Sequence, residues 1–107
     1  MNYPGSKNRL SKYIAPILMK YRERRVYIEP FVGICGMMQA IRGGTRIGSD
    51  DNESLIMMWQ GLQNGTFNPP VCASRELYAK LKADSEPSAV KGYVGIAFSH
   101  MGQFYGA

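Results

Sequence analysis

Acidic residues and glycines stand at two points of the chain where a nucleotide-like ligand could be held. Glu29 and Asp50 each follow a short run rich in β-branched or aromatic residues, a pattern typical of strands. Gly33 and Gly36 follow Glu29, and glycine permits the tight turn that brings backbone N–H groups close to a ligand. Roughly twenty residues separate this turn from Asp50, a spacing at which a β-α-β unit presents a carboxylate to a ribose. The pattern predicts a nucleotide-binding corner.

Two strands and a helix must position these residues. Residues 26–28 are expected to form a short buried strand that ends at Glu29, because Pro30 cannot donate to a sheet ladder. Residues 36–42 are expected to form a helix with the apolar side chains inward, and residues 45–49 the second strand. The two strands would be parallel, with the ligand outside their carboxyl ends.

The ribose acid has alternatives. Asp51 could take the role in place of Asp50, or Asp50 could cap the helix that follows. We favour ribose binding by Asp50, because the glycine turn lies at the matching distance upstream.

Three motifs in the first half of the chain occur in the order and spacing of a known family. They are Tyr3-Pro4-Gly5-Ser6-Lys7, Glu29-Pro30-Phe31-Val32-Gly33, and the segment GSDDNESLI at residues 48–56. Together they resemble the amino-terminal motif, the S-adenosylmethionine loop and the second-strand motif of Dam-type (D12 class) DNA adenine N6-methyltransferases. Cys35 departs from the family pattern, which has a second glycine there, so we expect a strained loop.

The resemblance implies a set of cofactor-binding residues. It assigns S-adenosylmethionine to Tyr3, Gly5, Lys7, Glu29, Pro30, Phe31, Gly33 and Asp50, with Lys7 beside the methionine end and Asp50 on the ribose. Binding is expected to be weak, because much of the usual pocket wall would belong to segments beyond these motifs.

Four further helices are predicted from apolar spacing and capping residues. They cover residues 8–22, where Pro16 should kink the helix or start a second segment, residues 53–63 up to Asn64-Gly65, residues 74–82 capped by Ser74, and residues 88–99 opened by Pro87. Trp59 is expected in the core and His100 at the surface. Residues 101–106 resemble the start of the target-recognition segment of the family.

The catalytic motif of the family, Asp-Pro-Pro-Tyr, has no counterpart in these residues. The sequence contains no Asp-Pro dipeptide, and Asn68-Pro69-Pro70 is followed by Val71, which cannot stack a flipped adenine. We interpret residues 68–70 as a linker, with no catalytic residue in the chain. The expectation is therefore that the chain alone does not methylate DNA.

Composition limits the remaining classes of function. The net charge of +5 and the crowding of basic residues near the amino terminus fit contact with DNA or a nucleic-acid-handling protein, as well as a solvated helix face. The residues assigned to such contact are Lys7, Arg9, Lys12, Arg22, Arg24 and Arg25. Cys35 and Cys72 lack metal-ligand spacing, so no metal is expected, and no membrane span or signal peptide is predicted. A cytoplasmic location in a bacterial host cell follows.

These observations predict an α/β fold, a partial Rossmann-like methyltransferase domain with about two parallel strands and four to five helices. We expect a single truncated domain, with a cofactor-binding part over residues 1–65 and a helical part over residues 66–107. The open edges of two strands require a partner, in a homo-oligomer or a hetero-complex. The alternatives are the cofactor half of a split methyltransferase, a phage-borne inhibitor of a restriction or CRISPR nuclease, and a fragment of an ordinary enzyme.

Overall fold

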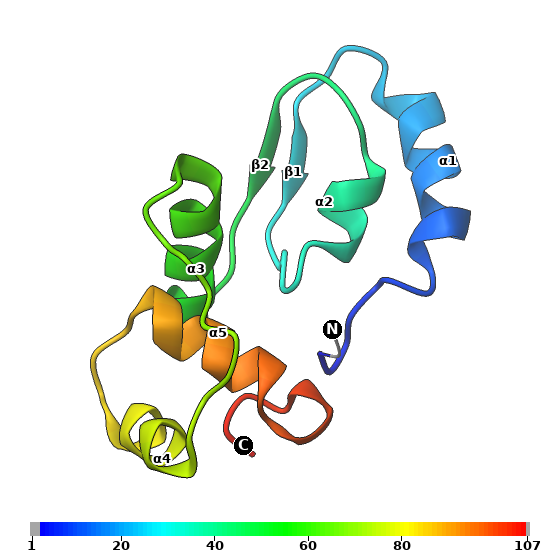
Figure 1. The fold of residues 1–107 in the computed structure, drawn as a ribbon. Coiled ribbons are helices and arrows are strands. Elements are labelled where there is room, and N and C mark those ends of the chain that lie inside the picture. The colour runs from blue at the N-terminus through cyan, green and yellow to red at the C-terminus, as the bar shows by residue number, and fades with distance from the viewer. Residues whose placement is uncertain (1–2, 107) are drawn as a thin grey trace. The chain divides into compact units, whose positions relative to one another are not determined.

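The structure, a computed structural model, describes residues 3–106. The elements in chain order are α1 (Ser11–Arg22), β1 (Tyr27–Glu29), α2 (Gly36–Ala40), β2 (Arg46–Gly48), α3 (Glu53–Asn64), α4 (Arg75–Ala83), α5 (Ala89–Ala97) and the 3-10 turn η1 (His100–Gly102) (Figure 1). Among the described residues they form two compact units, one of residues 5–51 and one of residues 3–4 with 52–106. The boundary after Asp51 falls inside the third predicted motif, residues 48–56.

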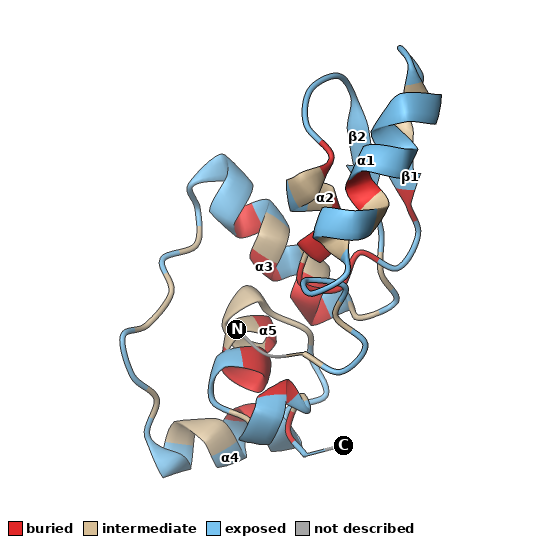
Figure 2. Cartoon of the chain, turned by 90° about the vertical axis from the view of Figure 1, so that its right-hand side faces the viewer, coloured by how far each residue is buried: buried red, intermediate tan, exposed pale blue. Residues whose placement is uncertain are grey.

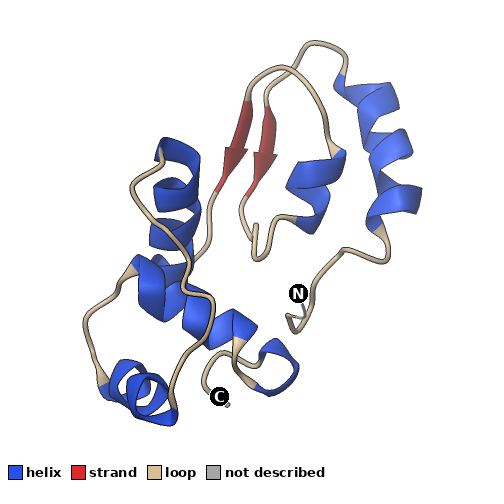
Figure 3. Ribbon diagram, in the orientation of Figure 1, coloured by secondary structure: helices blue, strands red, loops and turns tan. Residues whose placement is uncertain are grey.

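The unit of Gly5–Asp51 is built on a two-stranded parallel sheet. Tyr27, Ile28 and Glu29 of β1 pair with Arg46, Ile47 and Gly48 of β2, and α2 connects the two strands (Figure 3). Parallel strands joined through a helix are the β-α-β arrangement that the spacing predicted. The predicted α/β class is confirmed, with five α-helices and one two-stranded sheet in residues 3–106.

The core of this unit joins both helices to one side of the sheet. Ala15 of α1 packs against Met37 and Ile41, and Tyr27 of β1 packs against the same cluster. Met37 is 3% exposed and Ile41 fully buried, so the inward orientation predicted for them is confirmed, whereas Met38 is half-buried. The predicted helix over residues 8–22 begins three residues later, and Pro16 lies inside one continuous α1.

Burial of the first strand was predicted wrongly. Ile28 is 62% and Val26 50% exposed, and Ile47, the partner of Ile28, is 50% exposed. Successive side chains of a strand point to opposite faces, so Tyr27 reaches the core while Ile28 lies on the other face. β-branched residues indicated the strand correctly, but strand propensity does not report which faces are covered.

The second unit is a helical assembly around α5. Asn52, Ser74 and Ser88 cap α3, α4 and α5 by accepting the backbone N–H groups of Leu55, Leu77 and Lys91. The capping role predicted for Ser74 is confirmed. A Cβ at Gly92 would lie 2.3 Å from the carbonyl oxygen of Ser54, so glycine permits the close approach of α5 to α3.

Residues 101–106 fold back on this helical unit. The Tyr105 ring packs with Leu81 and Val94, and its hydroxyl donates to the Lys91 carbonyl oxygen at 2.7 Å. Trp59, predicted in the core, is half-buried, and His100 is exposed as expected. The segment that resembles a recognition loop thus contributes an aromatic side chain to the core.

Candidate cofactor-binding site

The loop after β1 is bound to the carboxyl end of β2 by an unbroken series of hydrogen bonds. Beyond the paired strands, Ser49 N donates to Glu29 O at 2.9 Å and Val32 N donates to Ser49 O at 2.8 Å. The Ser49 hydroxyl donates to Pro30 O at 3.0 Å. Gly33 N then donates to Asp50 Oδ2 at 2.9 Å. The glycine turn and the predicted ribose acid are therefore brought into direct contact.

Two residues of the turn have left-handed backbone conformations. Gly33 has φ +51° and Cys35 has φ +63°, and Cys35 N donates to Val32 O at 2.8 Å to close the turn. Glycine reaches this region without penalty, but a side chain there costs about 1–2 kcal/mol. The strained loop expected from Cys35 is confirmed.

Glu29 is buried at the start of this loop. It is 8% exposed, and the Tyr27 hydroxyl donates to Glu29 Oε2 at 3.2 Å. Burial raises the pKa of Glu29 above its ordinary value, and the Tyr27 hydrogen bond, the Lys7 charge and the Met38 backbone N–H oppose this increase. Burial and the adjacent carboxylate raise the pKa of Tyr27 to about 12. The Glu29 side chain is thus largely shielded from water.

The amino-terminal motif lies beside the same loop. A Cβ at Gly36 would lie 2.3 Å from Asn8 Oδ1 and 3.0 Å from the Asn8 backbone nitrogen, so the chain after Lys7 closely contacts the start of α2. The charge of Lys7 also acts on Glu29. Of the predicted residues, Lys7, Glu29, Gly33 and Asp50 are brought together.

The other predicted cofactor residues have different settings. Phe31 is 74% exposed, and Pro30 is exposed beside it. Gly5 is exposed with φ +75°, and a Cβ added there would meet no atom within 4 Å. Tyr3 is half-buried and belongs to the other compact unit. Among the described residues, the candidate site is therefore exposed to solvent at Phe31.

The helix after β2 is capped by Asn52, whose side-chain oxygen accepts Leu55 N at 3.2 Å. Asn52, and not Asp50, therefore caps α3. Asp51 is exposed and Asp50 half-buried. This arrangement favours Asp50 over Asp51 as the acid of the loop.

Two contributors were missed from the sequence. Tyr27 lies two residues before Glu29, and the alternation of a strand places both side chains on one face, which could have indicated their contact. Arg46 donates to the carbonyl oxygens of Met38 at 2.8 Å and Ile41 at 3.0 Å, which holds the end of α2 against β2. No sequence signal distinguishes Arg46 from a surface arginine.

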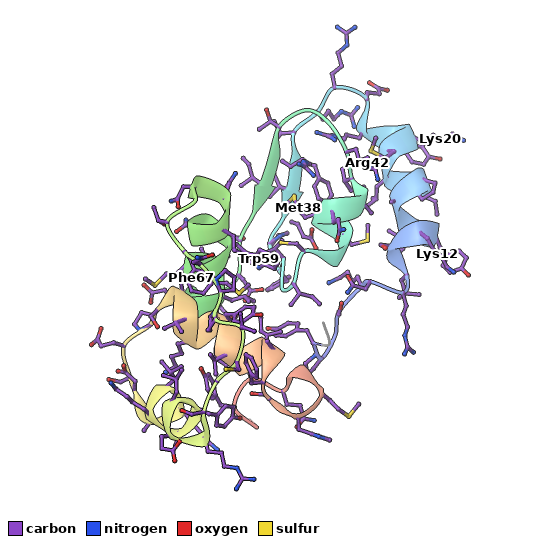
Figure 4. All side chains as sticks on the ribbon, in the orientation of Figure 1. Lys12, Lys20, Met38, Arg42, Trp59 and Phe67 are labelled. Atoms are coloured by element: carbon purple, nitrogen blue, oxygen red, sulfur yellow. The ribbon has the colours of Figure 1, made fainter. Side chains whose placement is uncertain are left out.

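The basic residues predicted to contact DNA or a partner have two settings. Arg22 donates to the carbonyl oxygens of Arg25, Arg42 and Thr45 at 2.9–3.2 Å. The side chains of Lys7, Arg9, Lys12, Arg24 and Arg25 are exposed. Figure 4 shows Arg42 near α1 and Lys12 extending from α1 on the side away from α2.

The segment Asn68-Pro69-Pro70 lies in an irregular loop after α3, and Val71 is 99% exposed. The interpretation of this segment as a connection between helices, without a preceding strand, is confirmed.

The donor and acceptor groups of the site fit a nucleoside cofactor. A carboxylate has about four acceptor positions, so Asp50 can accept from Gly33 and from ribose hydroxyls together. The carboxyl ends of two parallel strands are where such ligands bind in α/β folds. Among residues 3–106, no three metal-ligating side chains come together.

Most of the chain matches a known protein family. The model of the D12 class N6 adenine-specific DNA methyltransferase family matches residues 3–97. No curated protein and no solved structure matches the chain. Within the part of the chain that the structure describes, every helix is too short or too polar to cross a membrane.

Proposed function

Because the chain belongs to the D12 class N6 adenine-specific DNA methyltransferase family, we propose that its residues 5–51 bind S-adenosylmethionine at the carboxyl ends of β1 and β2. The observation that carries the proposal is the hydrogen bond from Gly33 N to Asp50 Oδ2, which joins the glycine turn to the acid after the next strand. In this family the bound cofactor supplies an electrophilic methyl group.

Each residue of the site has a separate task in the proposal. Asp50 accepts hydrogen bonds from the ribose hydroxyls, while the hydrogen bond that it accepts from Gly33 N fixes the carboxylate in place. Glu29 and Lys7, whose charge acts on Glu29, hold the zwitterionic methionine end. Phe31 offers an exposed ring against which the adenine can stack, and Gly5 belongs to the amino-terminal side of the site. The assignment of Tyr3 to the cofactor rests on the family motif alone.

The affinity of this site is proposed to be low. Phe31 is 74% exposed and Pro30 is exposed, so the described residues enclose a small share of a ligand's surface. Tight small-molecule sites bury most of the ligand. We expect a Kd of roughly 0.1 mM or weaker.

We also propose that the 107 residues act by binding and do not transfer the methyl group by themselves. Adenine methylation requires oxygen acceptors for the exocyclic amine and an aromatic face for the flipped base. Asn68-Pro69-Pro70 lacks the aromatic face, because Val71 occupies that position, and it lies in a loop that no strand precedes. The catalytic turn would come from another polypeptide segment, in keeping with the cofactor half of a methyltransferase.

Calorimetry with S-adenosylmethionine tests the binding proposal. Asp50→Asn should weaken binding about tenfold or more, since the amide is a poorer acceptor for ribose hydroxyls. The matched control is Asp51→Asn, which changes the exposed neighbour and should leave binding unchanged. Equal losses in both variants, or binding that Asp50→Asn does not affect, would overturn the assignment.

A methylation assay on adenine-containing duplex tests the second proposal. The purified 107-residue chain should transfer no methyl groups even at millimolar S-adenosylmethionine. Robust transfer would show that a catalytic turn exists within these residues.

The exposed basic residues Lys7, Arg9, Lys12, Arg24 and Arg25 are proposed to contact DNA phosphates or an acidic surface of a nucleic-acid-handling protein. Arg22 is assigned to the same surface, although its guanidinium already donates to three carbonyl oxygens. Filter binding at two salt concentrations should show affinity that falls steeply with salt and depends little on sequence. Salt-independent binding would contradict this role.

A further inference from the structure

The outer side of α1 carries an apolar stripe that the fold leaves uncovered. Tyr13, Ile17 and Tyr21 recur at every fourth residue and therefore lie along one face of the helix. They are 64%, 59% and 65% exposed, and Leu10 at the helix start is 55% exposed. We name these four residues the α1 stripe.

The stripe does not belong to the core of its own unit. Ala15, the buried residue of α1, lies on the opposite side of the helix and packs against α2, whereas Ile14 borders the stripe and is half-buried against the same cluster. Figure 2 shows α1 pale blue over most of its surface, with buried residues confined to a small patch. Helices of soluble proteins bury their apolar stripe, so a second, exposed stripe indicates an interaction surface.

Lysines border the stripe. Lys12 Nζ lies 5.0 Å from the ring centroid of Tyr13, and Lys20 Nζ lies 5.7 Å from that of Tyr21. Figure 4 shows Lys12 and Lys20 extending from α1 on the side away from α2. Each cation is thus held beside an aromatic ring of the stripe.

The surrounding charge is also positive. Residues 5–51 contain nine Lys or Arg and four Asp or Glu, whereas residues 52–107 contain four of each. The whole net charge of +5 therefore belongs to the unit that carries the stripe. A second copy of the same basic face would be repelled, and an acidic partner would be attracted.

We propose that the α1 stripe docks an acidic amphipathic helix of a partner protein. Apolar side chains at helical spacing pack into the α1 stripe, and carboxylates beside them pair with Lys12 and Lys20. A nucleic acid fits less well, because phosphates placed against Leu10 and Ile17 would lose their water without gaining a hydrogen-bond partner. The surface acts independently of cofactor binding.

The test uses a synthetic helical peptide with leucines at every fourth position and glutamates beside them, titrated by fluorescence anisotropy. Ile17→Glu should weaken binding at least tenfold, because it places a charge in the centre of the stripe. The control Val71→Glu alters a residue that is 99% exposed elsewhere and should have no effect. Ile17 is itself largely exposed, so the variant should retain its circular dichroism spectrum.

A second variant and further probes complete the test. The double variant Lys12→Glu with Lys20→Glu should weaken binding of the acidic peptide. It should leave unchanged the binding of a peptide that carries glutamine in place of glutamate. No binding of the acidic peptide at millimolar concentration, or binding that Ile17→Glu does not weaken, would overturn the proposal. It would also be overturned if a single-stranded oligonucleotide or phosphatidylserine vesicles bound this surface more tightly than the peptide and lost affinity with Ile17→Glu.

Discussion

Cys35 keeps a side chain at a backbone position that glycine occupies at lower cost. Its φ of +63° lies in the left-handed region, and the residue also precedes the first turn of α2. We predict that Cys35→Gly raises the free energy of unfolding by about 1 kcal/mol, since it removes the steric penalty of Cβ. Thermal unfolding followed by circular dichroism measures the change.

Cys35→Ala is the matched control for this strain. Alanine also removes the thiol but retains Cβ, so it should give no gain in stability. If alanine stabilised the protein as much as glycine, the thiol would be responsible, and the strain account would be wrong. Burial, with the Glu29 and Asp50 charges, raises the pKa of the Cys35 thiol to about 11. The thiol is therefore uncharged at neutral pH, and neither substitution removes a charge.

Glu29 makes stability depend on pH in an unusual direction for a carboxyl group. Burial raises its pKa in the folded state, so the folded protein holds this proton more tightly than the unfolded chain. Its contribution to stability is fully present below the unfolded pKa of about 4.5 and is lost as pH rises through the folded pKa. We predict that Glu29→Gln abolishes this loss of stability at higher pH.

Urea unfolding of both proteins between pH 4 and pH 7 measures the difference. Glutamine can still accept the Tyr27 hydrogen bond, so the variant isolates the charge. The stability of Glu29→Gln relative to the natural sequence should increase with pH. A difference that shrinks as pH rises would mean that the Lys7 charge outweighs the burial of Glu29.

At the scale of elements, Arg22 ties the end of α1 to the segments that flank both strands. Its guanidinium donates to the carbonyl oxygens of Arg42 and Thr45, on the connection into β2, and to that of Arg25 before β1. We predict that Arg22→Gln destabilises the protein by about 1–2 kcal/mol, because charged donors to carbonyl groups are lost. Urea unfolding measures the loss.

Arg24 provides the comparison for Arg22, since it is exposed two positions further along the chain. Arg24→Gln should change stability by less than about 0.5 kcal/mol. Equal losses in the two variants would show that the carbonyl contacts of Arg22 contribute nothing specific.

The boundaries of the helices were predictable because capping residues are local signals. Ser74 accepts a backbone N–H group of the first turn of α4, as predicted, whereas Ser88, predicted as the first helical residue after Pro87, instead caps α5. Glu29 and Asp50 were found because strand, turn and acid follow one another at a familiar spacing. The Arg22 and Arg46 contacts could not be predicted, since they depend on which distant carbonyl groups the fold places nearby.

On the scale of the whole molecule, apolar side chains remain exposed on the sheet. Ile28 and Ile47 are neighbours in register and are 62% and 50% exposed, and the sheet has two strands in residues 3–106. Unpaired strand edges and exposed apolar faces favour association. We predict that light scattering at rising concentration shows species larger than the monomer.

Ile28→Lys should reduce this association, because a lysine on an exposed strand disfavours pairing with another chain. Val71→Lys adds the same charge at a fully exposed position of the other unit and should leave association unchanged. A chain that stays monomeric at millimolar concentration would contradict the prediction.

The claim that Gly33 and Asp50 form a cofactor site is tested most directly by titrating the 15N-labelled chain with S-adenosylmethionine. We predict that the amide signals of Gly33 and Asp50 shift with added cofactor, and that those of Leu81 and Val94, buried in the core of the helical unit, do not. Asp50→Asn should suppress these shifts. Shifts confined to the helical unit, or none at millimolar cofactor, would contradict it.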